Sequence, residues 1–285
     1  MKILSPVRVA QNYNGQTSKS MEGKVPISVV ILTFNEEANI EYALKSVYGW
    51  ASEILIVDSY STDRTVEIAK RYTNRIYQHE FVHWADQRNW AIDNLPLSNH
   101  WIFFVDADEE VTDYLRNEII NLCVSGSIEH FNAFRVRQKF IFLGKWLKHS
   151  HEAKPLVRLV KKGKVKWISR GDVEPCDVSG VTRELQNFLL HFDRRDLSYW
   201  IERHNKNSSR EVGYLREPHQ KEESMMRRFY YKMPLFLRSF VYFLYHYILK
   251  AGFLDGLPGF IYCFLHACWY RFLVDAKLYE IKNSK

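Results

Sequence analysis

The sequence predicts an α/β protein in which a mostly parallel sheet is flanked by helices, followed by a C-terminal amphipathic helical region. Apolar runs of strand length alternate with helical stretches from residue 27 to about residue 124, which is typical of parallel sheets. The composition, with 46% hydrophobic and 26% charged residues, is that of a globular chain. The C-terminal region differs, because fifteen of the forty-two residues from 229 to 270 are aromatic.

The expected elements alternate between strand and helix. Strands are predicted at residues 27–32, 53–58, 75–78 and 101–105, and helices at about 36–48, from about 63, at 84–94 and from 112. After Gly126 the pattern changes to longer strand-like segments at 133–143 and 156–160, joined by basic turns. We therefore expect three parts: a flexible leader at 1–24, the main domain at 25–226 and a helical region at 227–285.

Positive charge is concentrated in one stretch of the chain. The formal net charge is +7, and residues 145–166 carry eight Lys or Arg against a single Glu. This pattern indicates an anionic partner, such as anionic lipid or a phosphorylated substrate. Nucleic acid is not expected, because no recognisable nucleic-acid-reading module accompanies the basic stretch.

Cysteine usage and the N-terminus indicate the compartment. The four cysteines form no C-x-x-C pair and have no regular spacing with histidine, which argues against a zinc site or a disulfide framework. The first residues lack the apolar core of a secretory signal. We therefore expect the main domain to lie in the reducing cytosol.

Two aspartates follow the fourth predicted strand. Asp106 and Asp108 stand where ligands bind in parallel sheets, and carboxylates two residues apart can converge on one hard cation. Alone, the pair would be a surface turn in which an aspartate caps the next helix. Its position after five apolar residues favours a metal site.

The first two strand ends offer polar groups for a nucleotide. Asp58 ends an apolar strand and could accept hydrogen bonds from a ribose or a base, although it could equally cap the next turn. Asn35 and Glu36 follow the first strand, and Asn35 is also a good helix N-cap. Asp63 is expected to cap the helix that follows it.

Four segments follow one another in a fixed order along the chain: Val29-Val30-Ile31-Leu32-Thr33-Phe34-Asn35-Glu36, Ile56-Val57-Asp58-Ser59 with Ser61-Thr62-Asp63, Ala85-Asp86-Gln87-Arg88-Asn89 and Val105-Asp106-Ala107-Asp108-Glu109. Together they resemble family 2 glycosyltransferases, most closely the bacterial branch that elongates lipopolysaccharide cores and lipid-linked glycans. The likeness covers residues 27–124 and extends to Gly252-Phe253-Leu254-Asp255-Gly256 with Lys277-Leu278-Tyr279-Glu280. Four motifs in order are more specific than any one of them.

This resemblance implies a glycosyltransferase A fold, a nucleotide-diphosphate sugar donor and inversion at the anomeric carbon. It implies Mg or Mn bound by Asp108 with help from Asp106. It also implies donor contacts from Thr33, Asn35, Glu36, Asp58, Arg88 and Asp106. Arg88 alone would be interpreted as a surface helix residue paired with an acid. The main domain then divides into a donor half at 25–125 and an acceptor half at 126–226.

Inversion requires a base beside the acceptor hydroxyl, because that hydroxyl loses its proton as the anomeric carbon is attacked. The family branch usually places a His-Glu pair after the basic strand segment, whereas residues 169–175 read Ser-Arg-Gly-Asp-Val-Glu-Pro. Glu174 is the leading candidate, followed by Asp172 and then Glu152. The alternative is a solvated turn with acids paired to Arg170.

Two other patterns restrict the mechanism. The spacing of His149, His151 and His191 suggests no catalytic cluster, so these histidines are expected to be solvated or structural. The Q-x-x-R-W signature of processive polysaccharide synthases is absent, which favours transfer of a single sugar.

The C-terminal region is expected to associate with a membrane. Leu237, Phe240, Leu244 and Ile248 share one helical face in a run shorter than a comfortable span, and residues 258–274 are apolar with basic edges. We expect a peripheral or monotopic enzyme at the cytoplasmic face of the inner membrane, with a lipid-linked or lipopolysaccharide-type acceptor. The alternative is a helical hairpin packed on the catalytic domain or on another copy.

Three other functions stay open at this point. A polyprenyl-phosphate sugar synthase is the nearest alternative. A nucleotidyltransferase normally needs a Gly-rich, Lys-bearing loop after its first strand, and residues 33–37 contain no glycine. A non-catalytic membrane adaptor is supported only by the histidine that is missing before Glu174.

Overall fold

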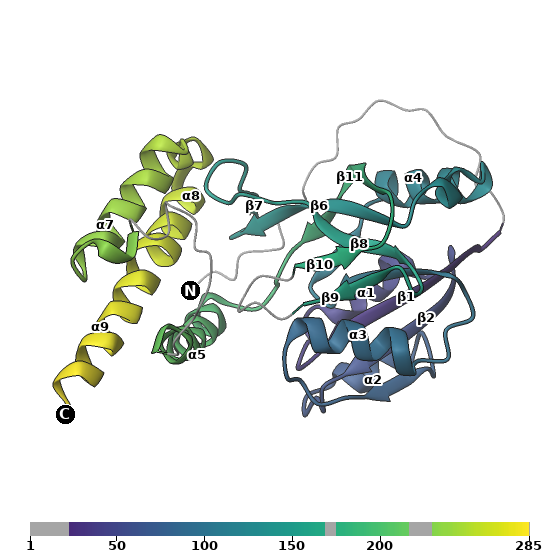
Figure 1. The fold of residues 1–285 in the computed structure, drawn as a ribbon, viewed down its shortest axis with the longest axis horizontal. Coiled ribbons are helices and arrows are strands. Elements are labelled where there is room, and N and C mark those ends of the chain that lie inside the picture. The colour runs from purple at the N-terminus through teal and green to yellow at the C-terminus, as the bar shows by residue number, and fades with distance from the viewer. Residues whose placement is uncertain (1–22, 169–174, 217–229, 285) are drawn as a thin grey trace, which may run out of the picture.

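The computed structural model describes residues 23–168, 175–216 and 230–284 (Figure 1). Its strands are β1 (Val25–Thr33), β2 (Ala51–Asp58), β3 (Ile76–Gln78), β4 (Trp101–Asp106), β5 (Glu109–Val111), β6 (Ala133–Phe142), β7 (Lys145–Trp146), β8 (Leu156–Lys161), β9 (Val165–Trp167), β10 (Cys176–Val178) and β11 (Thr182–His191). Its α-helices are α1 (Ile40–Val47), α2 (Thr65–Ala69), α3 (Trp84–Asn94), α4 (Asp113–Val124), α5 (Leu197–Arg216), α7 (Leu237–Leu244), α8 (Gly256–Tyr262) and α9 (Tyr270–Asn283). Short 3-10 turns are η1 (Ser127–His130) and η3 (Gly252–Asp255), and π-helical segments are η2 (Tyr245–Leu249) and η4 (Cys263–Trp269).

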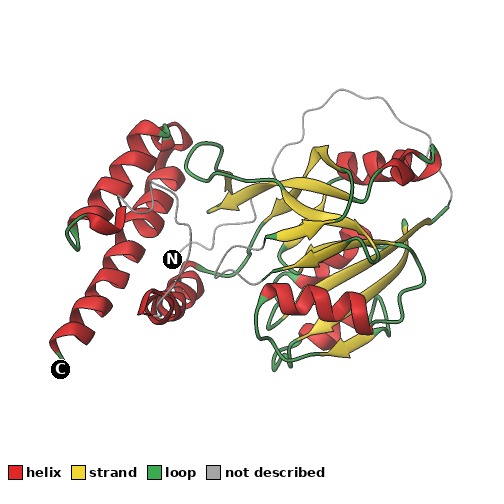
Figure 2. Cartoon of the chain, viewed as in Figure 1, coloured by secondary structure: helices red, strands yellow, loops and turns green. Residues whose placement is uncertain are grey.

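One sheet runs through both halves of the main domain, in the order β3-β2-β1-β4-β8-β6-β11-β5, with β7 paired to β6. The four strands β3, β2, β1 and β4 are all parallel, and β11 is parallel to β6. β8 and β5 are antiparallel to their neighbours. The predicted mostly parallel sheet flanked by helices is therefore confirmed (Figure 2).

The apolar strands of the donor half are buried on both faces. Val29 and Ile31 of β1 pack in the core that includes α1 and α4, whereas Val30 and Leu32 pack in the core that includes α3. Because both faces are covered, each strand is a continuous apolar run instead of an alternating one. This is why the strands could be recognised in the sequence.

Helix boundaries differ in places from the expectation. The helix predicted from about residue 36 begins at Ile40, because Asn35 has a left-handed backbone (φ 52°) and starts a turn. Thr112 caps α4 as predicted, since its side chain accepts the Leu115 N–H at 3.3 Å. Asp63 was expected to cap α2, but the N-cap residue is Arg64; Asp63 lies one position earlier and accepts the Thr65 N–H at 2.9 Å.

The C-terminal helices pack against α5 and the β6–β7 hairpin. Phe142, Leu147, Trp200 and Tyr262 form one shared core, and a second joins α5 to α9. In Figure 1 these helices form a layer beside α5, away from the donor half. Within the described residues, the stretch Gly252–Asn283 is long and apolar enough to cross a bilayer by length and composition, with a mean hydropathy of 1.2 and 39% of the apolar window buried.

Candidate active site

The candidate site lies where the strand order reverses. From β1 the sheet continues to β2 on one side and to β4 on the other, so the carboxyl ends of β1 and β4 border the topological switch point. Ligands of open α/β sheets bind in this crevice. Asn35 and Glu36 follow β1, and Asp106 and Asp108 stand at the end of β4, so the structure brings these predicted residues together.

Asp106 is held by two buried arginines. Arg88 of α3 places Nη2 at 3.0 Å from one carboxylate oxygen, and Arg158 of β8 places Nη2 at 2.7 Å from the other. Burial opposes ionisation, but the two guanidinium groups dominate and lower the pKa of Asp106. Arg88 is fully buried, so it is not the exposed helix residue that its position alone would have suggested.

Glu109 completes this buried network. Arg158 Nη2 lies 2.7 Å from Glu109 Oε1, Gln138 donates its amide to the same carboxylate, and Oε2 accepts the Asp106 N–H at 2.9 Å. Burial raises the pKa of Glu109 to about 7. Glu109 and Arg158 therefore fix both the backbone and the carboxylate of Asp106.

Asp108 lies beside His191, which comes from the end of β11. The register pairs His191 with Glu109, and the Phe192 N–H donates to the Asp108 carbonyl at 2.9 Å. His191 Nε2 then lies 3.6 Å from Asp108 Oδ2. Within the described part of the chain, the buried His191 Nδ1 has no hydrogen-bond partner. His191 was expected to be solvated or structural, and the structure places it beside Asp108.

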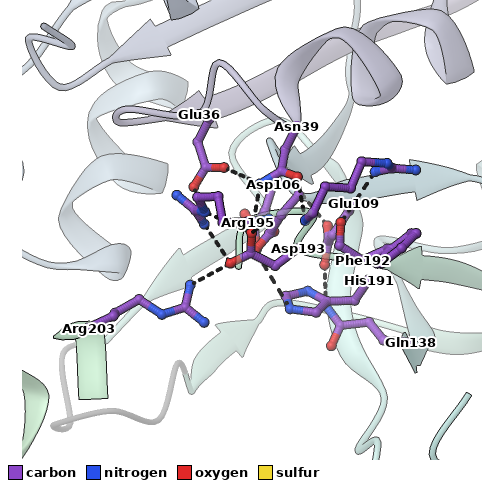
Figure 3. Close-up of polar contacts among 12 residues, drawn as sticks. Glu36, Asn39, Asp106, Glu109, Gln138, His191, Phe192, Asp193, Arg195 and Arg203 are labelled. Carbon is purple, nitrogen blue, oxygen red and sulfur yellow. Dashed lines mark hydrogen bonds and ion pairs between the residues drawn. The ribbon is translucent and has the colours of Figure 1, made fainter. Parts of the chain in front are cut away.

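The segment after β11 closes the site against the β1 end (Figure 3). Arg195 lies 3.0 Å from Glu36 and 2.7 Å from Asp193, and the Asn39 amide donates to both Glu36 and Asp193. Burial and the neighbouring Asp108 carboxylate raise the pKa of Glu36 to about 8, against the opposing effect of Arg195. The Asp108 carboxylate therefore lies close enough to Glu36 to affect the pKa of Glu36.

The loops after β1 and β2 are joined by hydrogen bonds. Asn35 Oδ1 accepts the Thr62 N–H at 2.8 Å, and the Asn35 N–H donates to Ser61 Oγ at 2.9 Å. Asp58 is fully buried and accepts the Ser61 N–H at 2.9 Å, which is the turn-capping role considered above. Thr33 Oγ1 is buried and has no partner among the described residues.

The candidate bases are only partly described. Glu174 and Asp172 lie outside the described residues. Glu152 is exposed and lies 3.5 Å from Lys250 of the C-terminal region. It belongs to the loop after β7, whose Ser150 N–H donates to Asp255 at 2.7 Å.

Sequence reasoning missed several residues of the site. Arg158, His191, Asp193 and Arg195 all come from the acceptor half, and their spacing carries no motif. A signal did exist for three of them. Residues 191–195, all polar except Phe192, directly follow the strand residues Leu189 and Leu190, so the strand-end rule applied to this strand would have found them.

The metal prediction can be compared with the available ligands. Across residues 23–168, 175–216 and 230–284, no group of three or more His, Cys, Asp or Glu side chains could hold a metal ion. Asp106 already faces two arginines, but Asp108 and His191 offer a carboxylate oxygen and an imidazole nitrogen side by side. A cation bound by these two groups would need further ligands from outside the protein, such as the oxygens of a bound diphosphate.

Comparison with known proteins finds a family match for part of the chain. Residues 28–127 match glycosyl transferase family 2. This segment is a family 2 glycosyltransferase domain. The sequence-based resemblance is therefore confirmed, and the glycosyltransferase domain accounts for β1 through α4.

The similarity to individual glycosyltransferases extends over most of the chain. The chain is 28% identical over 268 residues to the lipopolysaccharide core biosynthesis glycosyltransferase LpsC of Rhizobium meliloti, covering 90% of this chain and 93% of that protein. It is 25% identical over 267 residues to an uncharacterized glycosyltransferase of Rickettsia typhi, covering 90% and 87%. Among solved structures, S. aureus TarS 1-349 in complex with UDP is 14% identical, with 90% and 92% coverage and a TM-score of 0.44.

Proposed function

We propose that the chain is an inverting glycosyltransferase that moves one sugar from a nucleotide-diphosphate sugar to a lipid-linked or lipopolysaccharide-type acceptor. The observation that best supports this is the convergence of Asp106, Asp108 and His191 at the switch-point crevice of a family 2 domain. The acceptor class is supported by LpsC, whose name assigns it to lipopolysaccharide core biosynthesis.

The diphosphate would lie at the end of β4. Asp108 and His191 would hold Mg or Mn, with Asp106 as a further predicted ligand, and such a cation neutralises charge on the leaving diphosphate. Asp106 also holds the Arg88 and Arg158 guanidinium groups at this strand end. Positive groups fixed before the reaction stabilise developing negative charge without reorganisation.

The nucleoside would lie over the joined loops after β1 and β2. Thr33 offers a buried hydroxyl, and Asn35, Glu36 and Asp58 surround the same strand ends. The hydrogen bonds between the two loops hold this edge in place before the donor arrives. A preorganised edge reduces the entropy lost on binding.

The acceptor hydroxyl would attack from the acceptor half. As its oxygen bonds to the anomeric carbon, the bond to the diphosphate breaks and the hydroxyl proton moves to a carboxylate, for which Glu174 and then Asp172 are the candidates. Attack on the face opposite the leaving diphosphate inverts the configuration. We place this reaction at the cytoplasmic face of the inner membrane, with the C-terminal helices as the attachment.

The decisive experiment is a screen of nucleotide-sugars for metal-dependent donor hydrolysis by the purified full chain, followed by Asp108→Asn. We expect hydrolysis with one donor in Mg or Mn, and a loss of about a hundredfold to a thousandfold in Asp108→Asn, the usual scale for losing electrostatic stabilisation. Asp113→Asn, at a largely exposed aspartate, is the matched control and should retain full activity. Near wild-type turnover of Asp108→Asn after remetallation would refute the metal site.

A further inference from the structure

The first C-terminal helix presents an apolar stripe to solvent. Leu237, Phe240, Val241, Leu244 and Ile248 recur at the spacing of one helical face across α7 and η2, and each is exposed by 41% to 54%. Solvent exposure of so many large apolar side chains on one helix is unusual for a protein surrounded by water.

A second stripe lies beside the first. Phe253, Leu257, Phe260 and Phe264 follow the same spacing through η3, α8 and η4, with exposures of 41% to 69%. Phe243 joins the two helices, because its ring lies 6.2 Å from that of Phe260 and 6.3 Å from that of Phe264. The two stripes together form one surface, which we call the apolar face.

The opposite sides of these helices are fixed to the rest of the protein by polar contacts. Arg238 and Asp275 form a buried ion pair between α7 and α9. Arg271 of η4–α9 pairs with Glu211 of α5 at 2.6 Å, and Lys277 donates to Ser208 of α5 at 2.7 Å. The long apolar stretch Gly252–Asn283 is therefore bound along α5, which argues against its crossing a bilayer alone.

The basic stretch at 145–166 divides between two places, and one of them borders the apolar face. Lys145 Nζ lies 3.3 Å from the position of a β-carbon on Gly256, and the Lys148 N–H donates to Asp255. By contrast, the Lys162 N–H donates to the carbonyl of His100, the residue that directly precedes β4. That is the edge of the sheet opposite the candidate site. Lys162 and Lys164 therefore serve as a control for Lys145 and Lys148 in tests of membrane binding.

We propose that the apolar face lies flat in the interface of an anionic phospholipid bilayer, with Lys145, Lys148 and Lys250 at the level of the lipid phosphates. This rests on the proposed function, because a lipid-linked acceptor would be held at the same surface. Charge complementarity supports a bilayer, since lysines border the face at Gly256 and η2. A second copy of the chain would bring the same lysines to the contact and add like charges.

Asp255 links the apolar face to the candidate active site, so binding of that face to a membrane would orient the site relative to the bilayer. The Asp255 carboxylate accepts the N–H groups of Lys148, His149 and Ser150 at 2.7–3.1 Å, so η3 is fixed to the loop after β7. His151 follows in that loop and stacks on Phe140, with ring centroids 4.3 Å apart, and Phe140 stacks on His191 at 5.3 Å. A contiguous packed path thus joins the apolar face to the candidate metal ligand.

The test uses the full chain and sedimentation with vesicles of phosphatidylcholine alone or mixed with phosphatidylglycerol. Leu244→Glu with Leu257→Glu should weaken vesicle binding by at least about a hundredfold, since burial of each leucine side chain contributes roughly ten- to a hundredfold. Val124→Glu with Val181→Glu, at residues of similar exposure on the catalytic domain, is the matched control and should bind as wild type. Leu244→Gln with Leu257→Gln repeats the test without added charge, and thermal unfolding verifies the fold of each variant.

The lysines are tested separately. Lys145→Gln with Lys148→Gln should weaken binding to the phosphatidylglycerol vesicles by about thirtyfold and leave binding to phosphatidylcholine unchanged. Lys162→Gln with Lys164→Gln should change neither by more than about twofold. Equal losses from the two lysine pairs would overturn the assigned orientation.

Other outcomes separate this inference from the proposed function. The bilayer proposal is overturned, and the proposed function is kept, if the wild-type protein hydrolyses a donor but binds neither kind of vesicle. The same holds if light scattering shows a dimer that Leu244→Glu with Leu257→Glu converts to a monomer. If the wild-type protein binds vesicles but hydrolyses no nucleotide-sugar, the membrane role of the apolar face is kept and the proposed function is refuted.

Discussion

The donor half and the C-terminal helical region distribute apolar and charged groups in opposite ways. In the donor half, β1, β2 and β4 are buried and the charged groups gather at the strand ends. In the C-terminal region, large apolar side chains such as Leu249 and Leu257 face outward, whereas Arg238 and Asp275 are buried. The donor half therefore keeps its apolar side chains inside, whereas the C-terminal region exposes several large ones.

This difference also separates two uses of ion pairs. Around Asp106 the arginines lie at the candidate site, where the proposed function would use their positive charge on the leaving diphosphate. Between α7 and α9 the Arg238–Asp275 pair lies away from that crevice and holds two helices in one relative position. Because desolvation offsets much of the attraction in a buried pair, its value is expected to be orientation more than stability.

The largest effect is expected from breaking that helix pair. Arg238→Met leaves Asp275 buried without its charge partner, which should cost about 3–5 kcal/mol in the free energy of unfolding. Urea unfolding followed by circular dichroism measures the loss. Adding Asp275→Leu should recover most of it, because the uncompensated charge is then gone. If the double variant is no more stable than Arg238→Met, the pair is not the organising contact of the region.

A smaller but specific loss is expected in the catalytic domain. Glu174→Gln should lower the transfer rate by about two orders of magnitude, the usual scale for general-base assistance, and leave donor affinity nearly unchanged. Single-turnover transfer and donor titration measure the two quantities. A large loss in Asp172→Asn together with an active Glu174→Gln would assign the base role to Asp172.

The junction between the two regions is tested by Asp255→Asn. Both carboxylate oxygens of Asp255 accept N–H groups of the Lys148–Ser150 loop, but an asparagine amide has only one accepting oxygen. The free energy of unfolding should therefore fall by about 1–3 kcal/mol. The KM for the acceptor should rise and sugar transfer should slow, whereas the rate of donor hydrolysis should stay unchanged. An unchanged acceptor KM would show that the loop has no part in acceptor binding. The exposed Asp113→Asn is the control.

A pH-dependent effect is expected at two buried histidines that contact the C-terminal helices, His151 beside Tyr262 and His204 beside Tyr270. Burial lowers the pKa of His151 and of His204 to about 4, against 6.5 in the unfolded chain. Between these values the unfolded chain binds more protons, so stability should fall as pH decreases from 6.5 to 4 and change little from these groups above 6.5. His204→Phe keeps a ring against Trp200 and should flatten the pH dependence of urea unfolding in that window. An unchanged slope would show that His204 titrates normally.

The strands of the donor half were predictable because burial on both faces makes each of them a continuous apolar run. The start of α1 was not, since Asn35 is a good N-cap by residue type and only the bonds to Ser61 and Thr62 show that it forms a turn. The membership of β11 in the same sheet was also hidden, because its pairing with β6 joins residues about fifty positions apart.

The candidate site was half predictable for a related reason. Asp106, Asp108 and Glu36 follow strands that the sequence reveals, and the structure brings them to one crevice. Arg158 and His191 reach that crevice only through the register of β8 and β11. A spacing rule within one segment cannot detect contacts between strands that are distant in sequence. An arginine or histidine within or next to an apolar strand-like run is nevertheless a candidate for such a contact.

The carboxylate of Asp255 has a consequence for engineering. A protein shortened before η3 would expose three backbone amides of the loop after β7 and remove Tyr262 from the core it shares with Phe142 and Trp200. The C-terminal helices are therefore not an interchangeable tail. Hybrids that take these helices from one relative and the catalytic domain from another should exchange the 147–152 loop together with η3, so that both sides of this contact come from the same parent.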